Sequence, residues 1–149
     1  MRQTAWDDRE PHPLGSFGSQ SAGERRDENR ILDVESDIFA ATVAGRRLSD
    51  VFGDIIDAYP RHGFATDSWT EHHQGGPTGY VGRDPRASRM TAKDCLTVNQ
   101  AVAWNPSAPY TKIEDTVLLT EVGIEVLTVD ERWPTLDVDG RLRPVTLEL

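Results

Sequence analysis

The sequence predicts an α+β fold in which two helices precede an antiparallel sheet. Apolar residues recur at steps of three and four between residues 31 and 59, which indicates amphipathic helices. Beyond Gly63 this period disappears, and short runs rich in β-branched residues alternate with Gly and Pro, which indicates strands and turns. Helices followed by a run of antiparallel strands are typical of an α+β layer architecture.

Length and charge restrict the class of protein. The chain has 149 residues, which fits one domain. It carries 16 basic and 25 acidic side chains and a net charge of −9, so nucleic acids and anionic membranes are poor partners. Cys95 is the single cysteine, which excludes an internal disulfide and fits a cytoplasmic location. We see no signal peptide and no run apolar enough to span a membrane.

The N-terminal segment differs in composition from the rest of the chain. Residues 1–30 are rich in Gly, Ser, Pro and charge, and they show no apolar period. We therefore expect a disordered or unrelated extension over residues 1–30, followed by one domain over residues 31–149.

Two helices are expected at the start of this domain. From Ile31 onward the apolar spacing predicts a helix that ends before Gly45. A second helix is expected to begin at Ser49, whose side chain can cap it, and to end at Pro60 and Gly63.

Strands are expected in the remainder of the chain. Residues 96–106 and 112–120 read as two strands, and residues 121–128 follow through Gly123 as a hairpin partner. Asp139 and Gly140 lie between two alternating runs, which is a strong indication of a further hairpin.

Two neighbouring histidines form the first candidate site. The stretch TEHHQGGPTGY holds His72 and His73 ahead of a glycine-rich turn. Imidazole is a common metal ligand, yet adjacent strand residues point to opposite faces, so only one of the pair can face a given site. A metal site, a substrate-binding turn and an ordinary polar loop are all consistent with this spacing.

Two acidic residues inside an apolar strand form the second candidate site. In KIEDTVLL, alternation places Asp115 with Val117 on one face of the strand and Glu114 on the other. A carboxylate in such a strand is costly unless it is exposed, paired or bound to a cation. An exposed carboxylate on the solvated face of the sheet and a functional carboxylate are both open interpretations.

Several motifs in one order resemble a known family. HHQGGPTGY, VNQAVAWNP, TKIEDTVLLTEVGIEVLT and WPT follow one another. This order resembles the C-terminal half of the M24 metallopeptidases, which have the pita-bread fold and include Xaa-Pro aminopeptidases and creatinase. The resemblance implies a hydrolase of C–N bonds that acts on a peptide or small amide, often with divalent Mn, Co or Zn.

The resemblance also implies roles for individual residues. His73 and Glu114 lie where the family has metal ligands, and they are the candidate catalytic residues. Asn105 lies where the family has a second metal-binding Glu, and Tyr80 lies where many members have a substrate-contacting His. His72, Tyr80 and Asn105 are therefore candidate substrate-binding residues. Gly75 and Gly76 are expected to let a substrate approach the backbone.

The sequence departs from the family in one further respect. The family has a pair of metal-binding Asp residues in its N-terminal half, and no pair with that spacing precedes the predicted helices. The chain is therefore expected to lack that half. An M24 peptidase-like domain, a metal-independent creatinase-like hydrolase and a non-catalytic half-domain follow as alternatives, and a half-sheet of this kind invites a homodimer.

Overall fold

The fold has two layers, a sheet and a pair of helices. The structure, a computed structural model, describes residues 21–82, 84–109, 111–130 and 132–145. The elements in chain order are α1 (Ala22–Ala41), α2 (Leu48–Arg61), the 3-10 helix η1 (Ser68–Thr70), β1 (Gly75–Thr78), β2 (Ala101–Trp104), β3 (Ser107–Ala108), β4 (Thr111–Lys112), β5 (Asp115–Thr120), β6 (Gly123–Val126), β7 (Thr135–Val138) and β8 (Arg141–Pro144).

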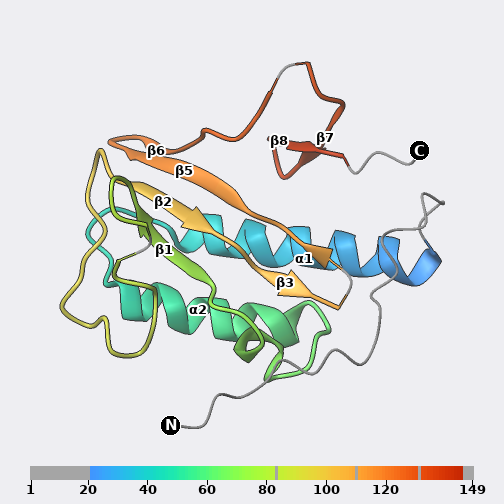
Figure 1. The fold of residues 1–149 in the computed structure, drawn as a ribbon, viewed down its shortest axis with the longest axis horizontal. Helices are drawn as coiled ribbons and strands as arrows, with labels where there is room; N and C mark the ends of the chain where they lie inside the picture. Colours follow the sequence, from blue (N-terminus) through green and yellow to red (C-terminus); the bar gives the residue numbers. More distant parts are fainter. Residues whose placement is uncertain (1–20, 83, 110, 131, 146–149) are drawn as a thin grey trace, which may run out of the picture.

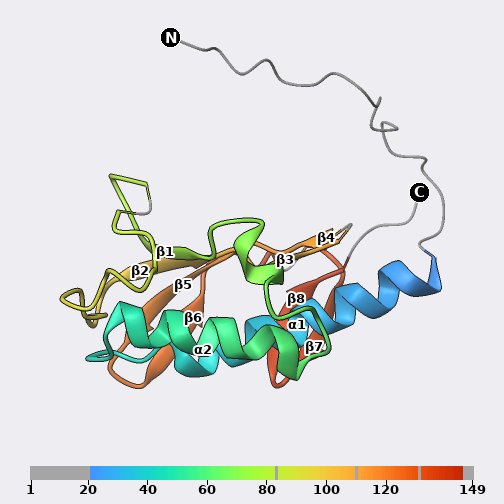
Figure 2. The same cartoon turned by 90° about the horizontal axis from the view of Figure 1, so that it is seen from below.

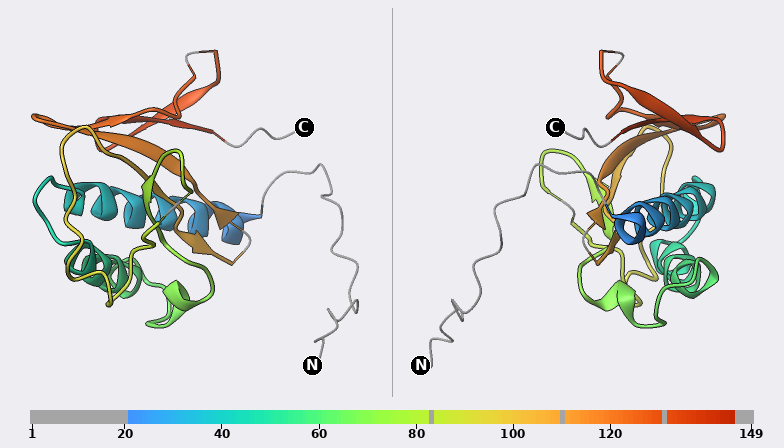
Figure 3. Two further views of the ribbon diagram at one scale, coloured as in Figure 1. Left: turned by 60° about the vertical axis from the view of Figure 1, so that its left-hand side comes forward. Right: turned by 90° about the vertical axis from the view of Figure 1, so that its right-hand side faces the viewer.

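The main sheet has the order β1-β2-β5-β6, and all its neighbours are antiparallel. Helices α1 and α2 lie side by side against one face of this sheet (Figures 1 and 2). The α+β prediction is confirmed. The β7–β8 hairpin forms a separate two-stranded sheet that stands apart from the main sheet (Figure 3). No helix within these described ranges combines the length and apolar character that a bilayer span requires.

The core lies between the helices and the sheet, and Trp104 is its largest fully buried side chain. The indole nitrogen of Trp104 donates a 2.9 Å hydrogen bond to the Thr42 hydroxyl, just after α1. The sheet residues that share this face are Val102, Val117 and Leu119, and the helices contribute mainly Ile31, Val34, Ile38, Leu48, Val51, Ile55 and Tyr59.

Helix α1 begins earlier than the apolar pattern predicts. Ser21 and Glu24 form a capping box, in which the Ser21 hydroxyl accepts from the Glu24 amide and the Glu24 carboxylate accepts from the Ser21 amide. These bonds lower the pKa of Glu24. The expected disorder is therefore wrong for residues 22–30, whose mostly solvent-facing surface leaves no apolar period to read. Residues 1–20 lie outside the described residues.

Helix α2 does not begin with the expected side-chain cap. It begins at Leu48, its N-cap is Arg47, and no side chain caps it, so the Ser49 prediction is wrong. The start is instead held by the segment that precedes β2, because the Leu48 amide donates to the Asp94 carbonyl at 2.8 Å and Arg47 forms an isolated bridge with Cys95. A long-range backbone contact therefore replaces a local cap.

The predicted strands are present but shorter. The strand predicted over residues 96–106 is reduced to β2. Asn99 has a positive φ of 64°, which interrupts the extended backbone before β2 begins. The strands predicted over residues 112–120 and 121–128 correspond to β5 and β6. The hairpin predicted at Asp139 and Gly140 is confirmed, and both residues have positive φ, 51° and 77°, as a type I′ turn requires.

Candidate functional site

Asn105 and Glu114, two of the candidate residues, lie on the sheet face that turns away from the helices. Trp104 and Asp115 are paired across β2 and β5, and both side chains turn toward the helices. Asn105 and Glu114 are the next residues in this register, because the Ile113 amide bonds to the Pro106 carbonyl one step beyond. Side chains alternate along strands, so Asn105 and Glu114 share the opposite face.

Asn105 connects this face to the histidines. Its amide Nδ2 lies 3.5 Å from Nδ1 of His73, while its own side chain is buried at 1% exposure. The Asn105 Oδ1 atom accepts no hydrogen bond from the described part of the chain. Asn105 is therefore a buried polar group whose amide nitrogen faces His73 and whose acceptor oxygen is unused within the described residues.

The two histidines are arranged differently. His72 and His73 lie with ring centroids 4.3 Å apart at an angle of 34°. Nδ1 of His72 is 2.7 Å from the carbonyl oxygen of His73 and donates to it, since a carbonyl can only accept. Neutral His72 therefore carries its proton on Nδ1, and His73 is the histidine that contacts Asn105.

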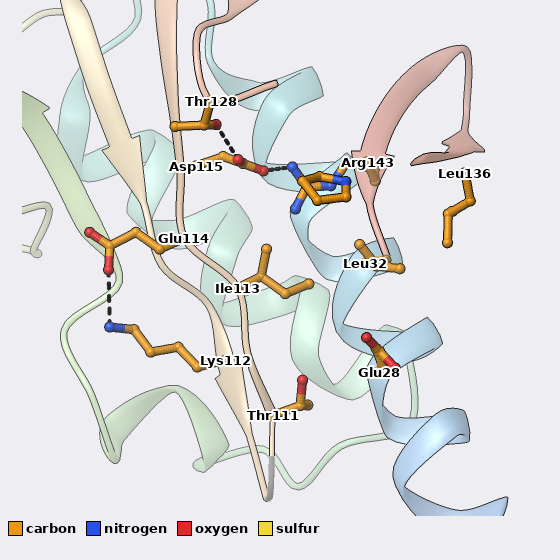
Figure 4. Close-up of a pocket in the computed structure, with 11 residues that line it drawn as sticks. Glu28, Leu32, Thr111, Lys112, Ile113, Glu114, Asp115, Thr128, Leu136 and Arg143 are labelled. Atoms are coloured by element: carbon orange, nitrogen blue, oxygen red, sulfur yellow. Dashed lines mark hydrogen bonds and ion pairs between the residues drawn. The ribbon is translucent and has the colours of Figure 1, made fainter. Parts of the chain in front are cut away.

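Glu114 and Asp115 have the two environments that alternation predicts. Figure 4 shows Asp115 directed toward Arg143 and Glu114 directed to the other side of the strand, where Lys112 pairs with it at 3.0 Å. The Glu114 side chain is 43% exposed, which matches the interpretation of a carboxylate on the solvated face. Asp115 is the buried carboxylate, and its Oδ1 accepts a hydrogen bond from Thr128.

Gln74 holds the histidine loop in place, and no sequence motif pointed to this residue. Its Oε1 accepts from the Tyr59 hydroxyl at 2.8 Å, and its Nε2 donates to the carbonyls of Trp69 and His72 at 2.9 and 2.8 Å. Tyr59 lies near the end of α2 and also accepts from the Ser107 amide at 3.1 Å. Burial raises the pKa of Tyr59, so it stays a neutral donor.

Removing the Tyr59 hydroxyl is expected to loosen this loop. Tyr59→Phe leaves the Gln74 oxygen and the Ser107 amide without their partner, which should lower the free energy of unfolding by about 1–3 kcal/mol. Urea denaturation followed by circular dichroism measures the change. Tyr80→Phe is the matched control, since Tyr80 is fully exposed and its change should stay within about 0.5 kcal/mol. Equal midpoints for the two variants would contradict the expectation.

Tyr80 is not brought to the histidines. It follows β1, whereas His72 and His73 precede it, and a strand of this length separates its ends by roughly 13 Å. Its side chain is fully exposed. The substrate-binding role of Tyr80 therefore stays a prediction, with no contact in the structure that supports it.

The two glycines after the histidines serve packing of the protein itself. A Cβ on Gly75 would lie 2.1 Å from the Ala103 carbonyl oxygen, and one on Gly76 would lie 2.7 Å from the Pro85 carbonyl oxygen. The space above each residue is thus filled by backbone. The expectation that these glycines admit a substrate is replaced by close approach of β1 to its neighbours.

A pocket of about 450 Å³ lies beside the histidine loop. Its apolar part includes Phe52 and Trp69, whose rings meet edge to face at 5.4 Å between centroids. Residues 70–74, which include both histidines, and Ala87 complete the lining. The arrangement offers an apolar recess next to two imidazole rings.

The donors in this chain do not fit a dinuclear metal centre. Among the residues that the structure describes, no three His, Cys, Asp or Glu side chains form a ligand group. The neutral Asn105 amide contacts His73, one of the two implied ligands, at 3.5 Å and stands where the resemblance implies a second Glu ligand. Two divalent cations repel each other strongly, and bridging carboxylates normally offset that repulsion. An amide in this position cannot supply the charge.

The fold defined by these elements is that of part of the pita-bread peptidases of the M24 type. The prolidase from Pyrococcus furiosus has a TM-score of 0.63 and 24% identity, over 77% of this chain and 35% of its own. The X-Pro aminopeptidase from Thermotoga maritima MSB8 has a TM-score of 0.62 and 21% identity, over 77% of this chain and 34% of its own. The Xaa-Pro dipeptidase from Bacillus anthracis has a TM-score of 0.60 and 21% identity, over 76% of this chain and 33% of its own.

These likenesses establish the fold alone, because every identity is below 25%. The chain spans about one third of the length of these structures. No protein-family profile matches the sequence, and no curated protein matches it significantly. The predicted resemblance is confirmed at the level of the fold.

Proposed function

We propose that this chain carries part of a peptidase-like C–N hydrolase site, which binds a peptide or a small amide on the sheet face opposite the helices. The observation that carries the proposal is the 3.5 Å contact between His73 and the buried Asn105, with Glu114, just before β5, next to Asn105 when the β2–β5 register is extended by one residue. An imidazole, an amide and a carboxylate on one face can together hold and polarise an amide bond.

The orientation of the Asn105 amide decides which nitrogen of His73 can act as a base. With Nδ2 toward His73, the amide donates to Nδ1, and neutral His73 carries its proton on Nε2. Rotation of the amide would place Oδ1 there, move the ring proton to Nδ1 and free Nε2 to accept a proton from attacking water. We assign His73 the role of general base and Glu114 that of the charged partner on the same face.

This assignment favours a metal-independent, creatinase-like reaction over a two-metal reaction. Asn105 is the specific reason, because it supplies no charge where a bridging carboxylate would be needed. Activity that persists after dialysis against a chelator would support this form. Activity that appears only with added Mn²⁺ would instead support the metallopeptidase form, with His73 and Glu114 as ligands and the remaining ligands from outside this chain.

Replacement of His73 tests the proposal directly. The protein is incubated with alanyl-proline and with a proline-containing tripeptide, with and without Mn²⁺, and release of free amine is followed. His73→Ala should reduce the rate by about 100-fold or more, the usual contribution of a general base. His62→Ala is the matched control, since His62 pairs with Asp37 of α1 away from this face, and it should retain the rate.

Each result has a definite meaning. Turnover by His73→Ala at the wild-type rate would exclude His73 as the base. Peptide binding by the wild-type protein without turnover, measured by calorimetry, would favour a non-catalytic half-domain. Neither binding nor turnover under any of these conditions would overturn the proposal.

The remaining sequence-based predictions belong to this proposal. We expect a homodimer, because β6 is the terminal strand of the main sheet and a free strand edge can pair with a second copy. We also expect a cytoplasmic location, since a single cysteine fits a reducing compartment. The acidic net charge supports neither nucleic-acid nor membrane partners.

A further inference from the structure

The β7–β8 hairpin is attached through a charged residue. Arg143 is the one buried side chain within the described residues 132–145, at 5% exposure. Leu136 and Leu142 of the same hairpin are substantially exposed. A two-stranded hairpin is marginally stable by itself, so its position beside α1 depends on contacts with the rest of the fold, and Arg143 makes the buried ones (Figure 3).

Arg143 joins three elements of the fold. Its Nη2 lies 3.0 Å from Glu35 of α1, and its Nη1 forms an ion pair with Asp115 of β5. The Thr128 hydroxyl completes the group by donating to Asp115, as Figure 4 shows. All three charged side chains are at most 6% exposed. One guanidinium therefore faces two buried carboxylates.

This group has an excess negative charge when all three side chains are ionised. Arg141, which lies over the Phe39 ring at 5.4 Å, acts on Glu35 only through space. Glu35 Oε1 is buried and accepts no hydrogen bond within the described ranges, which is costly for an ionised carboxylate. Burial accordingly raises the pKa of Glu35 to about 7, although Arg143 and Arg141 oppose the rise.

A pocket of about 260 Å³ lies beneath the hairpin. Leu32 of α1, Ile113 and Leu136 of β7 supply apolar lining, and Arg143 and Asp115 supply buried charge (Figure 4). Glu28 of α1 also lines the pocket, and Lys112 and Glu114 border it with their charged ends directed to the other side of the strand (Figure 4). Because β7 and β8 form one side of this pocket, displacement of the hairpin would open it.

We propose that the β7–β8 hairpin is a latch that is docked while Glu35 is protonated and is released as Glu35 ionises, which uncovers the pocket between α1, β5 and the hairpin. The latch goes beyond the proposed hydrolase function and does not depend on it. In the docked state Arg143 pairs with both Asp115 and Glu35, and a proton on Glu35 removes the one buried negative charge that this single guanidinium does not balance.

The direction of the pH effect follows from linkage. In the docked state burial raises the pKa of Glu35 to about 7, although Arg143 and Arg141 of the hairpin oppose the rise, and the proposed released state returns Glu35 to solvent and to its ordinary 4.5. Docking is strongest below pH 4.5, weakens as the pH rises from 4.5 to 7, and is weakest above pH 7. The opening equilibrium should rise by at most ~300-fold across this window, the factor that corresponds to the difference between the two pKa values.

Hydrogen exchange of the intact chain tests the latch. Protection factors of the 132–145 segment and of β5, corrected for the intrinsic pH dependence of exchange, are measured by mass spectrometry between pH 5 and pH 8. The hairpin should lose protection by up to about 70-fold between pH 5 and pH 8, while β5 stays protected. Glu35→Gln should keep the hairpin protected and remove the pH dependence, because it keeps the size of the side chain without its charge.

Two further variants complete the test. Arg143→Met should release the hairpin at every pH, and Arg132→Ala, which removes only an exposed pair with Asp130, should keep the wild-type profile. A Glu35→Gln variant that retains the wild-type pH dependence would overturn the proposal. Equal protection of hairpin and β5 at every pH would also overturn it, and neither result requires Arg143→Met to fold.

Discussion

Gly75→Ala is expected to displace β1 together with the histidines that precede it. A Cβ at this position would lie 2.1 Å from the Ala103 carbonyl oxygen and 2.9 Å from the Trp104 Cα, both backbone atoms that cannot rotate away. The φ of Gly75 is also +114°, which a residue with a side chain rarely adopts. The combined strain should lower the free energy of unfolding by about 3–5 kcal/mol.

Urea denaturation measures this loss, and the imidazole NMR signals of His72 and His73 report whether the loop has moved. Gly79→Ala is the matched control in the turn after β1, because nothing lies within 4 Å of a Cβ at Gly79. It should leave both the midpoint and the imidazole signals near those of the wild type. If the two alanine variants behave alike, close backbone packing is not the reason for glycine at position 75.

Trp104→Ala is expected to cause a loss of similar size from the centre of the core. Trp104 is fully buried, and its indole donates to Thr42, whose hydroxyl in turn donates to the Ile38 carbonyl at 2.7 Å. Removal of the ring creates a cavity and leaves Thr42 without this donor. The free energy of unfolding should fall by about 3–5 kcal/mol, as for other buried aromatic residues.

Trp133→Ala provides the comparison with the same residue type at a surface position. Trp133 is 45% exposed and lies just before the hairpin, so its loss should cost clearly less. Both variants are measured by urea denaturation with far-UV circular dichroism, since removal of either tryptophan changes the fluorescence baseline. Similar midpoints for the two variants would show that Trp104 does not stabilise the core as its burial indicates.

The sequence predicted those parts of the fold that depend on local pattern. The α2 apolar face, the β5 alternation and the Asp139–Gly140 turn each follow from residues that are neighbours in the chain. The start of α2 could not be predicted in this way, because it is set by a hydrogen bond to the Asp94 carbonyl, which is distant in sequence. The start of α1 could have been predicted from the capping box at Ser21, which the charged composition of that segment obscured.

The candidate site was likewise predicted only where it depends on local sequence pattern or on the family resemblance. Alternation separated Glu114 from Asp115 correctly, but only the structure identifies Asp115 as the buried one, because Glu35 and Arg143 come from distant segments. The contact of His73 with Asn105 joins two strands, and the resemblance to a family placed both residues in one site. Gln74 was missed, since nothing in its neighbours indicates a partner on α2.

The Gln74 contacts also determine which parts of the molecule respond together. The histidine loop is joined to α2 through the Tyr59–Gln74 hydrogen bond, in addition to its connection to the sheet through β1. A force on either imidazole ring is therefore transmitted to the last turns of a helix in the other layer. The histidine loop and the last turns of α2 are therefore coupled through a single amide side chain.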